Sequence, residues 1–498
     1  MGKSELLATE LEPQIDKAEL VHRLAEVLAP GSLLHELEDL KPYECDGLSA
    51  HCAVPLAVAL PENEQQVQQV MRICFEARVP VVARGAGTGL SGGAMPHLQG
   101  VTLGLSKLKK ILEVDPITRL ARVQPGVRNL AISEAAAPFG LYYAPDPSSQ
   151  IACSIGGNVA ENSGGVHCLK YGLTVHNLLA LRFVTIAGEL LEFGSLGLDA
   201  PGYDLMALAT GSEGLLGVVT EVTVKLLAKP AKAQVVLAAF DSLLKAGDAV
   251  ASIIGAGIVP AGLEMMDKLA TEAVEQFVHA GYPLDAEAIL LCESDGTAEE
   301  VAAEIERISE VMLESGAVEI RLSRDDVERL KFWSGRKAAF PAVGRILPDY
   351  YCMDGTIPKR KLGEVLQGIQ ALSKQFGLKC PNVFHAGDGN LHPLIMFDSN
   401  EGDQLQRAEA FGARILELCI AAGGTITGEH GVGIEKLDQM CLQFKPLELS
   451  TFLRIKTAFD EHGLLNPGKA VPTLHRCAEF GAMHVHRGQE KFPELPRF

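Results

Sequence analysis

The stretch Arg84-Gly-Ala-Gly-Thr-Gly-Leu-Ser-Gly-Gly-Ala94 holds five glycines in eleven residues and directly follows a predicted strand at 79–83. Backbone amides that no side chain shields can line up on a pyrophosphate, so this loop predicts a nucleotide-phosphate site. Residues 87–92 also fit the dinucleotide fingerprint, but that motif requires a helix opening at its last glycines. Gly92-Gly93 followed by Met95-Pro96 argues against such a helix, and therefore against a Rossmann site.

Two more glycine-rich segments lie further along the same region. The first is Pro145-Asp-Pro-Ser-Ser-Gln-Ile-Ala-Cys-Ser-Ile-Gly-Gly-Asn158, which continues into Glu161-Asn-Ser-Gly-Gly165. The second, Gly211-Ser-Glu-Gly-Leu-Leu-Gly217, precedes a strand of alternating pattern at 220–226. Three such loops at strand ends can wrap an extended dinucleotide along its whole length. The alternative is a set of surface turns that simply need glycine.

Two histidines bracket a tight turn in His385-Ala-Gly-Asp-Gly-Asn-Leu-His392, and Gly428-Glu-His-Gly-Val-Gly433 follows further along the chain. Apolar runs at 382–384 and 394–397 flank the turn, so it should fold two strands back on each other and bring the imidazoles together. Two histidines and Glu429 make an open site for Zn²⁺, Mn²⁺ or Fe²⁺, with His430 beside it as a general base. The alternative is ordinary core or surface histidines, and spacing alone does not separate the two.

The composition bounds the class of protein. The chain has 498 residues, 47% of them hydrophobic and 21% charged, which predicts a soluble globular protein of two or three domains. A formal net charge of −19 argues against a nucleic-acid partner, because phosphate neutralisation needs clustered Lys and Arg. No apolar stretch is long enough to cross a bilayer and no secretory signal opens the sequence, so a cytoplasmic location is expected. The eleven cysteines form no Cys-x-x-Cys pair, which predicts neither an iron–sulfur cluster nor a disulfide framework.

The order of predicted elements divides the chain. Residues 1–50 read as an N-terminal helical arm, and residues 51–228 as a small α/β unit followed by short strands and glycine turns. A linker at 228–232 leads to alternating strands and helices, which predicts an α+β domain. Within the α/β unit, one face of a predicted helix carries Val67, Val70, Met71 and Cys74.

Taken together, the glycine loops resemble the flavin-binding domain of the vanillyl-alcohol oxidase (PCMH-type) superfamily. The two histidine-containing segments resemble its metal-containing D-2-hydroxyacid dehydrogenase branch. Within that branch, the stretch at 472–486 resembles the tail of the large FAD-binding subunits of bacterial glycolate oxidase (glycolate dehydrogenase). The resemblance covers essentially the whole chain.

The fold that this resemblance implies is α+β. A PCMH-type FAD-binding domain of two α/β subdomains would occupy 51–228, and a substrate or cap domain with an antiparallel sheet would occupy 229–425 and carry the metal hairpin. A C-terminal helical segment at 426–470 would return to the flavin. The tail at 471–498, with His475, His484 and His486, is a candidate partner-docking element, and ordinary packing or a flexible end is the alternative.

The resemblance also implies a role for each matching position. His385, His392 and Glu429 would bind the metal, His430 would be the base, and Arg336 would clamp the substrate carboxylate. The FAD pyrophosphate would be cradled by the glycine loop: Arg84, Gly85, Ala86, Gly87, Thr88, Gly89, Leu90, Ser91, Gly92 and Gly93. The flavin and its ribityl chain would be lined by Pro145, Asp146, Gly156, Gly157, Asn158, Gly164, Gly165, Tyr171 and Gly172. The adenosine part would be contacted by Glu213, Gly217 and Val219, and the isoalloxazine would be approached by Asn466.

The substrate pocket departs from relatives that prefer larger hydroxy acids. Phe340 stands where they carry Thr, Cys352 where they carry Lys, and Leu394 where they carry Asn. The pocket should therefore be smaller and drier and favour glycolate or D-lactate, unless other polar groups take over. His97, the histidine nearest the glycine loop, lies beyond it and after Pro96, so FAD is expected to bind non-covalently.

The implied activity is FAD-dependent oxidation of glycolate to glyoxylate, and of D-lactate to pyruvate, by metal-assisted hydroxyl deprotonation and hydride transfer to flavin. Since the chain has no second redox centre, it would pass electrons to an iron–sulfur subunit, alongside a smaller flavin-domain subunit. Such a hetero-oligomer would be peripheral on the cytoplasmic face of the inner membrane. Three alternatives stay open: a stand-alone D-lactate or D-2-hydroxyglutarate dehydrogenase, a non-catalytic flavin relay subunit, and a metal-dependent hydrolase without flavin.

Overall fold

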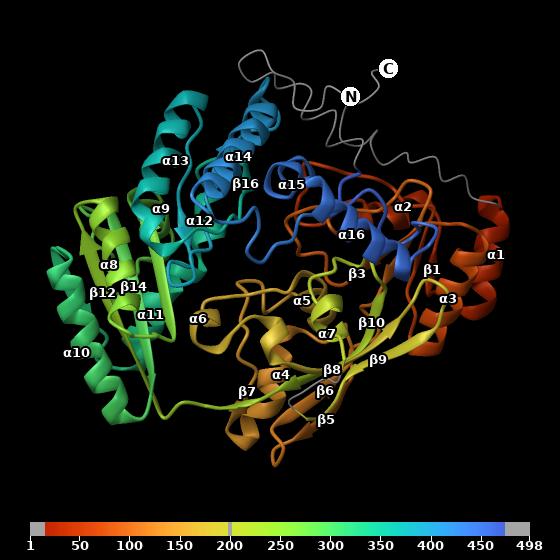
Figure 1. The fold of residues 1–498 in the computed structure, drawn as a ribbon, viewed down its shortest axis with the longest axis horizontal. Helices are drawn as coiled ribbons and strands as arrows, with labels where there is room; N and C mark the ends of the chain where they lie inside the picture. Colours follow the sequence, from red (N-terminus) through yellow and green to blue (C-terminus); the bar gives the residue numbers. More distant parts are fainter. Residues whose placement is uncertain (1–14, 198–201, 474–498) are drawn as a thin grey trace.

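The glycine loop connects two strands of a small, mostly parallel sheet in the first half of the chain. A computed structural model describes residues 15–197 and 202–473 and places this sheet beside two helices, α1 (Lys17–Val27) and α3 (Glu64–Glu76) (Figure 1). The strand order is β1 (Leu33–Leu34), β2 (Ala57–Ala59), β4 (Val101–Gly104) and β3 (Val81–Arg84), with β2, β4 and β3 parallel. Residues 85–100 contain no helix, which confirms the sequence argument against a Rossmann turn.

Helix α3 shows how local sequence builds this unit. Asn63 precedes the helix, and its side-chain oxygen accepts a hydrogen bond from Gln66 N at 3.0 Å, which satisfies one of the free amides at the helix start. The predicted apolar stripe is confirmed, because all its members are buried: Val67, Val70, Met71 and Cys74. The predicted N-terminal arm also adds β1 to the edge of the sheet, where Leu33 pairs with Ala59, before the short helix α2 (Leu37–Leu40).

A second, antiparallel sheet follows. Its order is β5 (Ile111–Asp115), β6 (Leu120–Val123), β10 (Val218–Lys225), β8 (Leu178–Val184) and β9 (Leu190–Gly194), and a small ribbon pairs β7 (Leu141–Tyr142) with β11 (Leu227–Ala228). Besides the predicted short strands and turns, helices also form in this region: α4 (Asn129–Ala136), α5 (Ile155–Glu161), α6 (Cys168–Tyr171) and α7 (Leu205–Ala209). Helix α5 was missed because its two glycines read as a loop, whereas Gly156 allows the helix to approach the backbone of Pro125 closely.

The second half is built on an antiparallel sheet with the order β15 (Glu319–Leu322), β12 (Lys232–Phe240), β14 (Ala288–Gly296), β13 (Gly262–Asp267) and β17 (Val383–Phe384). Strands β12 and β14 pair over nine residues and are buried on both faces. One face packs against α8 (Leu243–Gly255), α10 (Ala298–Glu314) and α13 (Leu362–Phe376), and the other against α9 (Lys268–Val278), α11 (Asp326–Lys337) and α12 (Ala339–Val343). In Figure 1 this green and cyan half lies beside the orange and yellow first half.

The hairpin that carries the two histidines joins two sheets. The two flanking segments fold back on each other as predicted, since Leu394 N donates to Pro381 O at 2.9 Å. Strand β17 also pairs with β13, and β18 (Leu394–Phe397) pairs with β16 (Asp349–Cys352). A short apolar run does not reveal which strand it will pair with. The turn itself is closed by His385 N donating to Asn390 O at 3.1 Å, and the two imidazole centroids lie 5.1 Å apart, as the turn chemistry predicts.

The C-terminal segment returns to the first half. After α14 (Gln404–Ala421), helices α15 (Leu437–Gln443) and α16 (Pro446–Phe459) cross back over it (Figure 1). Lys456 Nζ donates to the carbonyls of Leu215 and Leu465, which ties α16 to the glycine turn before β10. Among the described cysteines nine are free and Cys441 is disulfide-bonded. Residues 474–498, which contain the three tail histidines, lie outside the described part of the chain. Within the described part, no helix is long and apolar enough to span a bilayer.

Candidate active site and metal centre

A cavity of about 380 Å³ extends from the glycine loop to the histidine hairpin, and both halves of the chain line it. Glycines form much of its wall because side chains would not fit: a Cβ on Gly85 would lie 2.2 Å from Ser154 Oγ. Such a backbone-lined cradle fits an extended dinucleotide. The predicted FAD-binding residues that line it are Arg84, Gly85, Ala86, Gly87, Thr88, Gly89, Leu90, Gly93, Gly156, Gly157, Asn158, Glu213, Gly217 and Val219.

The remaining predicted FAD-binding residues do not line the cavity: Ser91, Gly92, Pro145, Asp146, Gly164, Gly165, Tyr171, Gly172 and Asn466. Several of them hold the frame. Asn466 Nδ2 donates to Gly93 O at 2.9 Å and to Glu213 O at 2.7 Å, so it joins two of the three glycine loops. Tyr171 OH donates to Asp295 in the second half at 2.8 Å.

Glu213 is predicted to contact adenosine, but its carboxylate is already engaged by protein. Its two oxygens accept hydrogen bonds from Val432 N and Gly433 N, both at 2.7 Å. Glu213 therefore holds the segment that follows His430. Nearby, Glu161 also lines the cavity, and burial raises the pKa of its carboxyl well above the usual range. Sequence inspection gave no signal for Glu161 beyond its place next to a glycine loop.

The metal-ligand candidates His385, His392 and Glu429 converge as the sequence predicts. Glu429 Oε1 lies 3.3 Å from His385 Nε2 and 3.2 Å from His392 Nε2, and one donor atom from each residue lies within 4.8 Å of the others. Neither Nε2 makes a hydrogen bond of good geometry, and both side chains are 3% exposed. Buried donor atoms without partners are costly. Two imidazoles and one carboxylate that converge in this way fit a divalent cation such as Zn²⁺, Mn²⁺ or Fe²⁺.

The charges of this cluster favour metal binding. Burial lowers the pKa of His392 to about 4, so its imidazole is neutral at pH 7. Burial alone would raise the pKa of Glu429, but His385 and His392 hold it well below its usual range. Burial alone would lower the pKa of His385, but Glu264 and Glu429 raise it well above. A metal held here would meet the carboxylate of Glu429 and a neutral imidazole at His392.

His430 lies at the cavity wall beside this cluster. Its ring stacks on His392 with centroids 4.9 Å apart and an interplanar angle of 6°, and its Nε2 lies 3.9 Å from Glu429 Oε1. Its Nδ1 has no hydrogen-bond partner. Its backbone is fixed at both ends, since Ser91 Oγ donates to His430 O at 2.9 Å and His430 N donates to Asp354.

Asp354 organises this segment, and sequence inspection missed it. Its Oδ2 accepts hydrogen bonds from the amides of residues 428, 429 and 430 at 3.0, 2.9 and 2.7 Å. Its Oδ1 pairs with Lys436 Nζ, and both side chains are fully buried. Burial alone would raise the pKa of Asp354, but Lys436 lowers it to about 2. The only sequence signal is an Asp-Gly dipeptide, which marks turns throughout proteins.

Arg336, the predicted carboxylate clamp, lies at the end of α11 and is 2% exposed. Its Nε donates to Glu264 Oε2 at 2.7 Å, and its Nη2 has no partner. Arg336 is not among the residues that line the cavity, whereas the next residue, Lys337, is. Phe340 also lines it, with its ring centroid 6.4 Å from that of His392. The other two pocket departures, Cys352 and Leu394, are paired across β16 and β18 and buried in the core behind Phe340.

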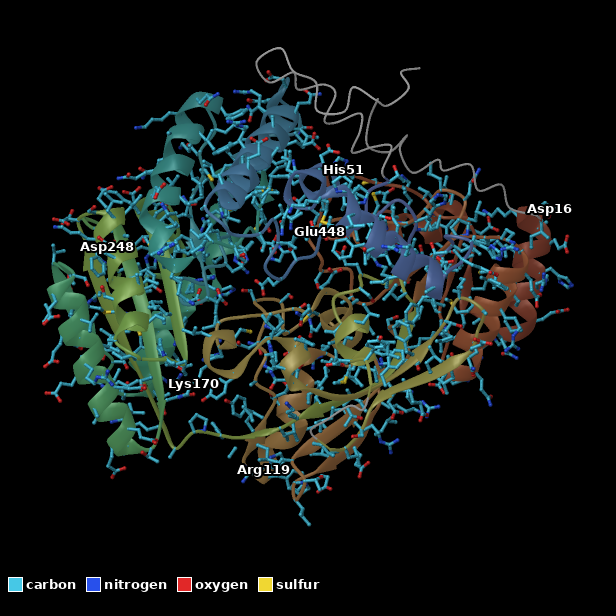
Figure 2. The ribbon with its side chains drawn as sticks, viewed as in Figure 1. Asp16, His51, Arg119, Lys170, Asp248 and Glu448 are labelled. Carbon is cyan, nitrogen blue, oxygen red and sulfur yellow. The ribbon has the colours of Figure 1, made fainter. Side chains whose placement is uncertain are left out.

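The two halves are clamped where α6 meets β14. His167 Nδ1 lies 2.8 Å from Asp146 Oδ2, and its Nε2 lies 3.4 Å from Glu293 Oε1. Lys170, labelled in Figure 2, donates from Nζ to Asp295 Oδ1 at 2.5 Å. Burial alone would lower the pKa of His167, but the two carboxylates raise it to about 10. A charged imidazole thus bridges the halves and fixes the cavity between them.

Comparison with known proteins identifies the class. Residues 55–194 match the profile of an FAD binding domain, and residues 229–470 match that of the FAD linked oxidases, C-terminal domain. The chain belongs to the FAD-linked oxidase family, so it is an oxidoreductase that binds FAD.

Individual relatives narrow the comparison. The glycolate oxidase subunit GlcD of Escherichia coli (strain K12) is 62% identical over 486 residues, which cover 98% of this chain and 97% of that protein. A D-lactate dehydrogenase of Anaerostipes hadrus is 31% identical over 463 residues, covering 91% and 97%. The crystal structure of p-cresol methylhydroxylase is only 17% identical but aligns with a TM-score of 0.78 over 92% of this chain and 97% of that one. The predicted family and the PCMH-type α+β fold are confirmed.

Proposed function

We propose that this chain oxidises a small 2-hydroxy acid, glycolate to glyoxylate and D-lactate to pyruvate, with FAD as the hydride acceptor. One observation carries the proposal: His392, Glu429 and His430 line the same cavity as the glycine loops. Acid–base and metal-ligating groups at one end of a cofactor cavity are what alcohol oxidation requires. The relatives named glycolate oxidase subunit and D-lactate dehydrogenase support the substrate class.

When bound, FAD accepts a hydride and a divalent cation held by His385, His392 and Glu429 supplies a Lewis acid for the substrate hydroxyl. The protein residues then divide the remaining work. His430 takes the hydroxyl proton, because its imidazole is at the wall beside the metal ligands with Nδ1 unpartnered. A positioned base of this kind contributes roughly 10²–10⁴-fold to the rate.

Positive charge for the substrate carboxylate comes from α11. Arg336 is anchored through Nε and keeps Nη2 for a ligand, and Lys337 presents an ammonium at the cavity. A carboxylate fixed by a guanidinium orients the Cα hydrogen toward the flavin. Phe340 beside His392 limits the space for a longer acid, which favours glycolate and D-lactate over 2-hydroxyglutarate.

FAD binds non-covalently in this proposal. His97 is buried outside the cavity wall, and its Nδ1 accepts a hydrogen bond from Gln99 N at 3.1 Å, so its ring is held within its own turn. Electrons leave through a partner, an iron–sulfur subunit beside a smaller flavin-domain subunit at the cytoplasmic face of the inner membrane. The name of the 62% identical relative, a subunit, supports such an assembly.

The test is anaerobic mixing of the purified, FAD-loaded chain with glycolate, D-lactate and D-2-hydroxyglutarate, while the flavin absorbance is followed with and without prior chelation. We expect glycolate and D-lactate to bleach the flavin, D-2-hydroxyglutarate to bleach it far more slowly, and chelation to abolish all bleaching. This half-reaction needs no electron acceptor. Folded, yellow protein that stays oxidised with all three acids would contradict the proposal and favour a relay subunit.

A further inference from the structure

Glu264 contacts two different parts of the candidate site, the metal-ligand cluster and the arginine assigned to the substrate carboxylate. It lies in the middle of β13, is 1% exposed, and makes two short contacts. Its Oε1 lies 2.7 Å from His385 Nδ1, and its Oε2 accepts a hydrogen bond from Arg336 Nε at 2.7 Å. One carboxylate thus contacts both a metal-ligand candidate and the arginine assigned to the substrate.

The register of the sheet explains the first contact. Met265 pairs with Phe384 and Met266 with Val383, so the next position brings Glu264 opposite His385. A carboxylate at Nδ1 selects the tautomer with the proton on that nitrogen, which leaves the lone pair on Nε2. That Nε2 lies 3.3 Å from Glu429 Oε1, in the cluster that fits a cation.

The second contact fixes the guanidinium. With Nε engaged by Glu264 and the whole side chain buried, Arg336 has few orientations left. Its Nη2 is buried without a hydrogen-bond partner, so a donor is left for an anionic ligand. His385 and Arg336 therefore both depend on Glu264 for their orientation, and Glu264 lies on β13, outside the sequence motifs that contain those two residues.

We propose that Glu264 is a positioning residue that couples metal binding at His385 to substrate carboxylate binding at Arg336. This inference rests on the proposed function. Loss of the carboxylate frees the tautomer of His385 and the orientation of Arg336 at once, so both the metal and the substrate bind more weakly. A purely structural ion pair would instead lower stability and leave both affinities unchanged.

Asp267 provides a matched control on the same strand. It is also a buried carboxylate, and its oxygens accept hydrogen bonds from Ala270 N at 2.9 Å and from Asn382 N and Nδ2 at 3.1 and 2.8 Å. It anchors the base of the histidine hairpin but contacts neither His385 nor Arg336 in these hydrogen bonds. Asp267→Asn should therefore lower the free energy of unfolding without changing the contacts that Glu264 makes with His385 and Arg336.

The experiment compares Glu264→Gln, Glu264→Asp and Asp267→Asn in the FAD-loaded chain. Zn²⁺ affinity is measured by competition with a chromogenic chelator, and the glycolate Kd and limiting flavin-reduction rate are separated by varying glycolate. We expect Glu264→Gln to weaken Zn²⁺ binding by about 10–100-fold, the usual effect of losing a carboxylate behind a metal-bound histidine, and to raise the glycolate Kd as well. Asp267→Asn should keep both within about twofold, the scatter expected of an indirect change.

Glu264→Asp keeps the charge and shortens its reach, so it should fall between wild type and Glu264→Gln, and it serves if the Gln variant does not fold. Wild-type affinities in either Glu264 variant, or equal losses in Asp267→Asn, would overturn the coupling while leaving the proposed function intact. A wild-type chain that binds no metal and is not reduced by any of the acids would overturn both.

Discussion

The two ends of the cavity are built from different materials. The cofactor end is made of backbone: glycines of three loops, whose missing side chains set the shape of the wall. The metal end is made of buried charged and polar side chains, including Glu264, Arg336, Asp354, Glu429 and Lys436. Added side-chain volume should therefore impair the cofactor end, and removal of a charge should impair the metal end.

This difference has a physical basis. A backbone cradle contributes partial charges and close approach, so a single methyl group alters it by steric overlap. Buried ions depend on their ionic and hydrogen-bond partners, so loss of one charge leaves its partner poorly compensated. Each end can therefore be tested with substitutions that change either volume or charge and preserve the other property.

The largest effect should come from the base. His430→Ala should slow substrate-driven flavin reduction by roughly 10²–10⁴-fold, because the hydroxyl proton loses its acceptor. The metal and FAD contents should stay at wild-type levels, since His430 is not among the three converging ligand candidates. Stopped-flow reduction by glycolate, with metal and flavin analysis of the same sample, checks this. Unchanged reduction would remove His430 from the role of base.

The next effect concerns the buried pair behind the metal end. Asp354→Asn keeps the shape of the side chain but removes one carboxylate from the Lys436 ammonium, which is 0% exposed and then has only the Glu435 carboxylate, at 3.5 Å, as an ion-pair partner among the described residues. We expect a loss of about 3–5 kcal/mol in the free energy of unfolding, together with a lower metal content because the amides of 428–430 are released. Denaturant titration measures the first, and metal analysis after dialysis the second.

Asp115→Asn is the control for that substitution. Asp115 also accepts two backbone amides, from Ile117 at 2.8 Å and Thr118 at 3.2 Å, but it lies at a surface turn with no cationic partner among its hydrogen bonds. Its removal should change stability little. If the two variants lost equal stability, the buried charge would not be the cause.

The sequence revealed the two ends unequally. The glycine loop and the His385–His392 turn are local motifs, so their residues could be named and their convergence foreseen. Glu264 lies 121 residues before His385, and Asp354 lies 82 residues before Lys436, so only the folded chain brings them together. Nothing in a single sequence marks a carboxylate on an apolar strand as the anchor of a distant histidine.

Strand pairing explains the other shortfalls. The apolar runs around the histidine turn predicted two strands correctly, but their partners β13 and β16 are set by tertiary packing. Similarly, the glycines of α5 suggested a loop because Gly lowers helix propensity, whereas contact with Pro125 requires glycine in that helix. Local sequence patterns predicted where strands form, whereas long-range contacts determine which strands pair and where a helix needs glycine.

The third prediction adds volume at the cofactor end. A Cβ on Gly156 in α5 would lie 2.6 Å from Pro125 Cβ and 3.0 Å from Pro125 O. We expect Gly156→Ala to cost about 1–3 kcal/mol through overpacking, and to lower the FAD retained per chain because the residue lines the cavity. Thermal unfolding and flavin absorbance after gel filtration measure the two effects.

Gly255→Ala at the end of α8 is the matched control, because a Cβ there meets nothing within 4 Å. In an open helical position alanine is favoured over glycine by about 0.5–1 kcal/mol, so this variant should be as stable as wild type or more stable. The two substitutions should therefore have opposite signs. Equal stabilisation by both would mean that the cradle tolerates volume, against the comparison above.

The smallest expected effect concerns a charge outside both ends of the cavity, on His167 between the two halves of the chain. The pKa of His167 is raised to about 10 in the folded chain, against about 6.5 in an unfolded one. Its contribution to stability is therefore fully present below pH 6.5 and is lost as the pH rises through 10. Because 28% of the side chain stays exposed, solvent screening limits this contribution to about 1 kcal/mol.

His167→Gln removes this titration and keeps a polar side chain between Asp146 and Glu293. From pH 7 to pH 10 the wild type should lose about 1 kcal/mol more stability than the variant, as measured by denaturant titration at each pH. Other groups also titrate in this range, but they are common to both proteins and cancel in the difference. A variant that loses as much as wild type would show that the imidazole charge does not hold the halves together, and would confine ionic stabilisation to the fully buried metal end.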